Sequence, residues 1–126
     1  MFREPPQYLE NDHFFFEAEQ DLEEVCNTPK DKDGVFKVLE LRNGKVTLVY
    51  LGFSKSNGLW DEIVNGLHYD KNPRKLGWSY QLLKDRTDAI DVYWYVTPPT
   101  EEPKAIQTKM LKQFQEDYGK LPKWNK

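Results

Sequence analysis

The clearest hydrophobic and polar pattern along the chain lies in residues 34–52. Two runs, residues 35–41 and 46–51, are rich in β-branched, aromatic and aliphatic side chains, which is typical of strands. Asn43 and Gly44 lie between the runs, and both tolerate the positive φ that a type I′ turn requires. The pattern therefore predicts a β-hairpin.

A third strand is predicted at residues 89–97, where apolar and polar or phenolic side chains alternate. Helical spacing of apolar residues predicts helices within 17–26, 58–67 and 75–84 and after Pro103, with Asn57 as N-cap of the second and Gly119 ending the last. The predicted buried faces are Ala18, Leu22 and Val25; Leu59, Ile63 and Leu67; Leu76, Tyr80 and Leu83; and Ala105, Met110, Leu111 and Phe114.

This order of a hairpin, helices, a third strand and a final helix predicts an α+β fold with layer packing rather than alternating βαβ units. Residues 1–33 are expected to form an N-terminal extension, a loose leader over 1–12 followed by a short helix. Residues 34–126 are expected to form one domain. Trp124 is expected to anchor the tail.

Composition narrows the function classes. The 126 residues are 38% hydrophobic, and no apolar run approaches the roughly 20 residues of a membrane span. We expect a cytoplasmic protein with no membrane partner. The net charge is −3, but residues 1–33 contain ten acidic and three basic residues, whereas residues 104–126 contain six lysines and two acids. The acidic total weighs against a nucleic-acid module, while the lysines give one end a surface compatible with phosphates.

Two tripeptides and the C-terminal segment carry a family resemblance. Gly34-Val35-Phe36 opens the first hairpin strand and Tyr50-Leu51-Gly52 closes the second. This arrangement resembles the GIY-YIG endonuclease family, whose excinuclease C members begin in this way. Residues 106–125 are similar to the last helix and closing Asn of that family, and the matches cover most of 34–125 in the same order. The resemblance implies a three-stranded antiparallel sheet flanked by helices.

The resemblance also implies four catalytic positions, namely a tyrosine from each tripeptide, an arginine on the first helix and a metal-binding glutamate on the last helix. They fall at Phe36, Tyr50, Glu62 and Gln107, with Asp61 the neighbouring choice for the third. Only Tyr50 matches. Phenylalanine has no hydroxyl, glutamate has the wrong charge for a phosphate clamp, and glutamine lacks the charge that retains a hard cation.

Other residues are weaker candidates. Glu101 and Glu102, or Lys71, Arg74 and Lys75, would serve as replacements only in a rearranged site, and surface charges are the simpler interpretation. His13, His68 and Cys26 do not have the spacing of a zinc site.

Three functions follow from these observations. The first is a GIY-YIG-like domain with impaired catalysis that binds DNA, RNA or an unidentified protein, with no cofactor expected. The second is an active endonuclease with substituted catalytic groups, which would require Mg²⁺ or Mn²⁺. The third, favoured by the acidic N-terminal third, is a protein-interaction domain without a nucleic-acid role.

Overall fold

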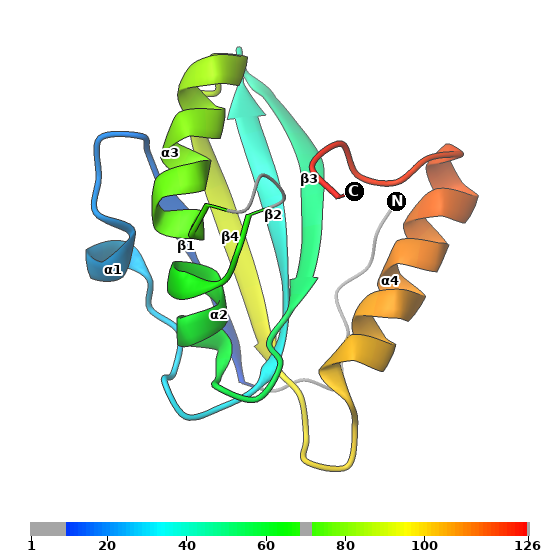
Figure 1. Cartoon of the computed structure of the whole chain (residues 1–126). Coiled ribbons are helices and arrows are strands. Elements are labelled where there is room, and N and C mark those ends of the chain that lie inside the picture. Colours follow the sequence, from blue (N-terminus) through cyan, green and yellow to red (C-terminus); the bar gives the residue numbers. More distant parts are fainter. Residues whose placement is uncertain (1–9, 69–71, 126) are drawn as a thin grey trace.

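The computed structural model describes residues 10–68 and 72–125 and has an α+β fold around one antiparallel sheet (Figure 1). The strands are β1 (Asn11–Phe16), β2 (Gly34–Arg42), β3 (Lys45–Phe53) and β4 (Ala89–Val96), in the spatial order β1-β4-β2-β3. The helices are α1 (Leu22–Val25), α2 (Leu59–Asn65), α3 (Arg74–Asp85) and α4 (Pro103–Tyr118).

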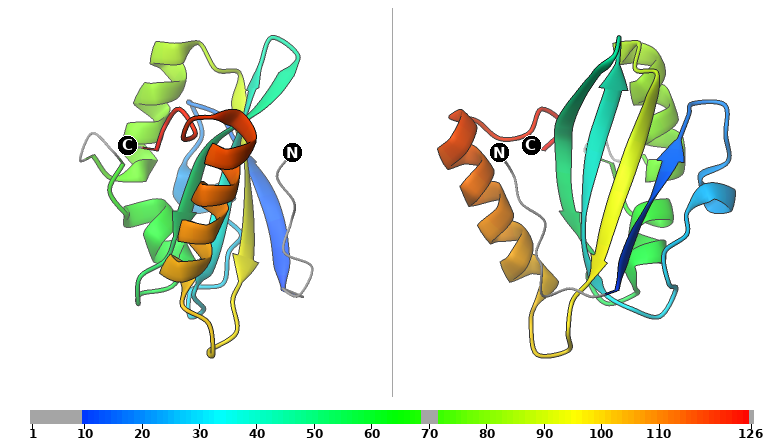
Figure 2. Two further views of the ribbon diagram at one scale, coloured as in Figure 1. Left: turned by 90° about the vertical axis from the view of Figure 1, so that its right-hand side faces the viewer. Right: turned by 180° about the vertical axis from the view of Figure 1, so that it is seen from behind.

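Helices cover both faces of the sheet. α2 and α3 pack on the face that carries Phe36, Val38 and Val92, while α4 packs on Val35 and Leu51 of the opposite face. In the right-hand view of Figure 2, α2 and α3 lie behind the sheet and α4 lies beside the β3 edge. The functional site described below lies at that edge.

The predicted hairpin is confirmed. β2 and β3 pair from Val35 opposite Phe53 to Arg42 opposite Lys45. Asn43 has φ of 52° and Gly44 has φ of 78°, as a type I′ turn requires.

The N-terminal region differs from the prediction. The sheet has four strands rather than three, because residues 11–16 form β1 and pair with β4. Within β1, Phe14 and Phe16 are buried, whereas Phe15 is 52% exposed. The predicted helix over 17–26 shrinks to the single turn α1, capped by Asp21, whose side chain accepts from the backbone N–H of Glu23. Alternation over three residues was too short to reveal a strand whose partner, β4, lies far along the chain. Of the predicted leader, residues 1–9 lie outside the described residues.

Two details of α2 and α3 also differ. Gly58, not Asn57, is the N-cap of α2, with φ of 93°, and a Cβ there would lie 2.5 Å from the Lys30 carbonyl oxygen. α3 buries Trp78 and Leu82 instead of the predicted stripe. At Gly77 a Cβ would lie only 2.8 Å from the His68 Cβ, so this glycine allows α3 to approach closely on its Trp78 face. The predicted stripe is exposed: Leu76, Tyr80 and Leu83 are 62%, 60% and 70% exposed.

The last helix and the tail follow the prediction more closely. α4 begins at Pro103, ends before Gly119 with φ of 74°, and buries Met110 and Phe114, although Ala105 is exposed. Trp124 is buried, and its backbone N–H donates to the Val49 carbonyl at 2.9 Å. The predicted anchor is therefore confirmed, and the tail covers part of the open edge of β3. Within the described ranges, none of the helices combines the length and apolarity needed to cross a membrane.

Candidate functional site

A pocket of about 360 Å³ lies at the β3 edge, between the α2–α3 turn and α4. Three of the four residues singled out by the family resemblance line it, although they come from β3, α2 and α4. The lining residues are Tyr50, Gly52, Phe53, Lys55, Glu62, Asn65, Gly66, Leu67, Arg74 and Gln107.

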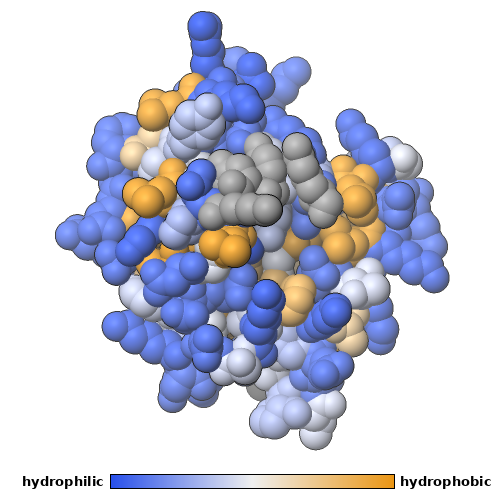
Figure 3. Space-filling model, viewed as in Figure 1, coloured by the Kyte–Doolittle hydropathy of each residue, from blue (hydrophilic) through white to orange (hydrophobic). Residues whose placement is uncertain are grey.

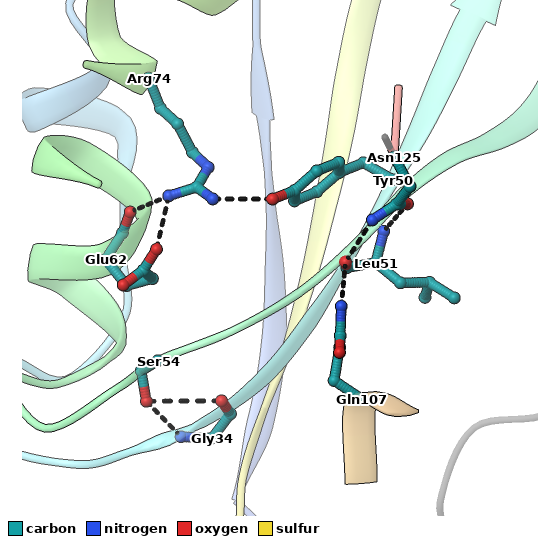
Figure 4. Close-up of polar contacts among 8 residues, drawn as sticks. All are labelled: Gly34, Tyr50, Leu51, Ser54, Glu62, Arg74, Gln107 and Asn125. Carbon is teal, nitrogen blue, oxygen red and sulfur yellow. Dashed lines mark hydrogen bonds and ion pairs between the residues drawn. The ribbon is translucent and has the colours of Figure 1, made fainter. Parts of the chain in front are cut away.

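Arg74, the first residue of α3, links Glu62 and Tyr50 of the pocket. Its Nη1 donates to the carboxylate Oε2 of Glu62 at 2.8 Å and to the Glu62 main-chain carbonyl. Its Nη2 donates to the Tyr50 phenol oxygen at 2.8 Å (Figure 4). The Arg74 and Glu62 side chains are only 4% and 16% exposed, so this ion pair is largely removed from water.

The turn between α2 and α3 is shaped to admit this guanidinium. Gly66 ends α2, and its carbonyl accepts from the Arg74 backbone N–H at 2.9 Å. A Cβ at Gly66 would lie 2.1 Å from Arg74 Nη1 and 2.6 Å from Glu62 Oε2. Glycine is therefore required here for space, because any side chain would displace the ion pair.

Aromatic rings surround the rest of the guanidinium. The Arg74 Cζ lies 5.5 Å from the Phe36 ring centroid, 5.4 Å from that of Tyr50 and 5.9 Å from that of Trp78. Arginine over aromatic faces is favourable, and more so when water is excluded. Phe36 thus forms a wall of the Arg74 site, fully buried and behind the pocket rather than lining it.

Tyr50 is positioned to donate a hydrogen bond. Its oxygen already accepts from Arg74, an obligate donor, so the phenol proton must point elsewhere. The phenol lines the pocket. The Tyr50 O–H is therefore available to donate to an acceptor other than Arg74.

Gln107 is held from the α4 side. Its Nε2 donates to the Leu51 carbonyl at 3.2 Å, which also accepts from Asn125 Nδ2 at 3.0 Å. The Asn125 Oδ1 in turn accepts from the Leu51 N–H at 2.9 Å. These contacts fix the strand next to Tyr50 from its open edge.

Lys55 reaches the pocket from the loop after β3. Ser54 anchors that loop, because its Oγ accepts from the Gly34 N–H at 2.9 Å and donates to Asp33 Oδ1 at 2.9 Å. The same Asp33 oxygen accepts from the Gly58 N–H at 3.0 Å at the start of α2. Lys55 itself is exposed, at the pocket rim.

The residues considered as catalytic replacements lie in different places in the structure. Arg74 belongs to the pocket, and its interpretation as a surface charge is wrong, since it is 3% exposed. Glu101 and Glu102 line a different pocket, beside Asp33 and Pro98. Lys71 lies outside the described residues.

Asp61, and the residues considered for a zinc site (His13, His68 and Cys26), are not among the hydrogen-bond partners of Arg74 in the described structure. The Asp61 carboxylate accepts from Asn65 Nδ2 at 3.1 Å. Burial raises the pKa of the Cys26 thiol, which contacts the Thr28 hydroxyl at 3.3 Å. In residues 10–68 and 72–125, no three His, Cys, Asp or Glu side chains are grouped so that they could hold a metal ion.

One feature of the sequence indicates that Arg74 is buried, although the spacing of apolar residues does not include it. Arg74 stands four residues before Trp78, one helical turn away, so a buried Trp78 places Arg74 on the same face. The predicted stripe of Leu76, Tyr80 and Leu83 pointed to the wrong face and so concealed it.

Comparisons of the chain with protein-family models, curated proteins and solved structures found no match. The function is therefore inferred from the chemistry of the pocket.

Proposed function

We propose that this chain is a nuclease-like domain of the GIY-YIG type that binds nucleic acid through a phosphate group and is impaired in cleavage. One observation carries the proposal. Tyr50, Glu62, Arg74 and Gln107 meet at one pocket, and Glu62, the only carboxylate that lines it among the described residues, is paired with Arg74.

The meeting of these residues supports the family resemblance. The resemblance selected Tyr50, Glu62 and Gln107 from sequence alone, without any knowledge of their spatial proximity. They line a common pocket although they come from β3, α2 and α4, and α3 and β4 lie between the last two along the chain. Arg74 adds a cation, supplied by α3 where the resemblance implies α2.

The ligand set favours binding over cleavage. Hydrolysis assisted by a divalent metal needs anionic oxygen ligands that remain free for the ion. Glu62 is engaged by Arg74, and Gln107 contributes an amide whose nitrogen is bound to Leu51. Among the described residues a metal would therefore find one occupied carboxylate and one neutral carbonyl, which is a weak site for Mg²⁺ or Mn²⁺.

The donors of the pocket suit a phosphate. The two positive charges of Arg74 and Lys55 exceed the single negative charge of Glu62, and Tyr50 contributes a phenol proton. Phosphate oxygens accept hydrogen bonds of this kind, and the charge-assisted ones are the strongest. The acidic total of the chain, net −3, limits long-range attraction, so we expect modest affinity that falls with salt.

The presence of Arg74 beside Tyr50 favours a second candidate, the active endonuclease. An arginine near the phenol restores one group whose loss argued against catalysis. In this case Mn²⁺ would support cutting, and Tyr50→Phe would abolish it.

The exposed stripe of α3 favours a third candidate, the protein-interaction domain. Leu76, Tyr80 and Leu83 are adjacent on the helix surface and exposed. Figure 3 shows apolar surface on this side of the molecule among hydrophilic residues. A domain with this role alone would not bind nucleic acid at moderate salt.

A binding and cleavage assay separates the three candidates. Labelled single-stranded, duplex and branched DNA and RNA are titrated with the protein at several salt concentrations, with and without Mn²⁺, while anisotropy and strand length are followed. We expect salt-sensitive binding without cutting, weakened by Lys55→Gln but not by Lys45→Gln, which removes an exposed lysine at the other end of β3. Metal-dependent cutting would establish the endonuclease, and absence of binding would overturn the proposal.

A further inference from the structure

The Arg74 guanidinium retains donor capacity beyond its contacts with Glu62 and Tyr50. Nη1 donates two hydrogen bonds to Glu62, to its main-chain carbonyl and its carboxylate, and Nη2 donates one to Tyr50. The Arg74 Nε is buried and has no hydrogen-bond partner among the described residues. A buried donor without an acceptor is costly, and such groups often mark a ligand position.

Glu62 occupies the part of Arg74 that an oxyanion ligand would use. Carboxylate and phosphate present similar pairs of oxygens to a guanidinium, so the two groups compete for one position. Building on the proposed phosphate-binding function, we propose that Arg74 is a phosphate subsite, and that the Glu62 carboxylate is a resident competitor that phosphate monoesters displace more readily than phosphodiesters.

The surroundings allow Glu62 to leave while Arg74 stays. Glu62 lines the pocket and its side chain is 16% exposed, so rotation brings its carboxylate into water. Arg74 remains held by the Glu62 main-chain carbonyl and by Tyr50. The aromatic rings of Phe36 and Trp78 also restrain it. The subsite is therefore formed before a phosphate arrives, and displacement costs little reorganisation.

Charge decides which phosphates displace Glu62. A phosphodiester carries one negative charge, as the carboxylate does, so the exchange on Arg74 is nearly balanced. A phosphate monoester carries about −1.5 to −2 at neutral pH and attracts the guanidinium more strongly. The ligand selected by this competition is a phosphate monoester, such as the terminal phosphate of a nucleic acid strand.

The test compares two oligonucleotides that differ only in a 5′-phosphate or 5′-hydroxyl. Wild type is expected to bind the phosphorylated strand about tenfold more tightly, equivalent to about 1.4 kcal/mol. Glu62→Gln keeps an oxygen acceptor for Arg74 but removes the charge. We therefore expect it to bind both strands about tenfold more tightly and to keep the preference, because both ligands displace the same carboxylate from Arg74.

Two controls assign the effect to Arg74. Asp61→Asn removes the same charge one residue earlier on α2 and should change neither affinity by more than about twofold, since surface charges contribute little. In an Arg74→Gln background, Glu62→Gln should give no gain. An equal gain from Asp61→Asn, or a gain that persists without Arg74, would overturn the proposal.

A measurement on the wild-type protein covers the case in which Glu62→Gln fails to fold. Inorganic phosphate is titrated while the arginine Nε–H resonances are followed by NMR, with Arg74 assigned through Arg74→Lys. The Arg74 resonance is expected to shift with saturation, and an unmoved resonance would overturn the proposal. If no oligonucleotide binds but phosphate shifts this resonance, the subsite stands and the nucleic-acid function fails. If oligonucleotides bind without a preference for the 5′-phosphate, the nucleic-acid function stands and the phosphate-subsite proposal fails.

Discussion

The Arg74 Nη2 donates to the Tyr50 phenol oxygen at 2.8 Å, although 24 residues separate the two along the chain. This hydrogen bond joins the first turn of α3 to the edge strand β3. It also fixes the direction of the remaining phenol proton, because an oxygen that accepts from arginine must donate elsewhere. A side chain that the family resemblance selected is thus oriented by one that it did not select.

Tyr50→Phe is expected to lower the free energy of unfolding by about 1–3 kcal/mol, because it leaves a buried guanidinium N–H without an acceptor. Urea unfolding followed by tryptophan fluorescence measures the change. Tyr80→Phe is the matched control, since that phenol is 60% exposed, and its effect should stay within about 0.5 kcal/mol. Equal effects of the two substitutions would contradict the role of Tyr50 as the partner of Arg74.

Gln107→Glu is expected to create Mn²⁺ affinity that the wild-type chain lacks, because it returns a carboxylate to the α4 side of the pocket. It should also destabilise the fold by about 1 kcal/mol, since the donor to the Leu51 carbonyl is lost. Isothermal titration with Mn²⁺ measures the first effect. Gln115→Glu, at an exposed position of the same helix, should give neither result, and Mn²⁺ binding by wild type would contradict the prediction.

Asn125→Ala is expected to speed hydrogen exchange at the Leu51 amide, because that N–H loses its acceptor at the open edge of β3. Asn125→Asp separates the two contacts, since a carboxylate still accepts from Leu51 N–H but no longer donates to its carbonyl. Exchange at Leu51 should therefore be fast in Asn125→Ala and slower in Asn125→Asp. Unchanged exchange in Asn125→Ala would show that the tail does not hold the strand.

Cys26 provides a prediction about pH. Burial raises the pKa of its thiol, so the folded state favours the neutral form. Its contribution to stability is complete below the ordinary thiol pKa and is lost as pH rises through the raised value of the folded state. Wild type should lose stability at alkaline pH faster than Cys26→Ala, as measured by urea unfolding across pH. Parallel curves would show that the thiol is not responsible.

Elements encoded by local pattern were predictable from the sequence. The Asn43-Gly44 turn and the apolar runs beside it specify the hairpin without help from the rest of the chain. Pro103 and Gly119 likewise mark the ends of α4. β1 was missed because its pairing with β4 depends on residues remote in sequence, which periodicity does not detect.

The candidate site was predictable only in part, for a similar reason. The tripeptides and the last helix indicated Tyr50, Glu62 and Gln107, which do line one pocket. The importance of Arg74 depends on the turn at Gly66 and on which face of α3 is buried. Both are properties of tertiary packing, and helical spacing alone allowed two apolar faces.

The order of the strands has a consequence for synthesis. Within the described residues β1 pairs with β4 alone, and His13 and Asp91, which bond across that pair, are 78 residues apart. During translation Phe14 and Phe16 therefore do not meet their partners on β4 until residues 90–92 have been made. Such non-local pairing slows folding and leaves apolar residues open to chaperones in the interval. Acidic residues follow β1 directly in the sequence, and charges that flank an apolar strand oppose its aggregation while it is unpaired.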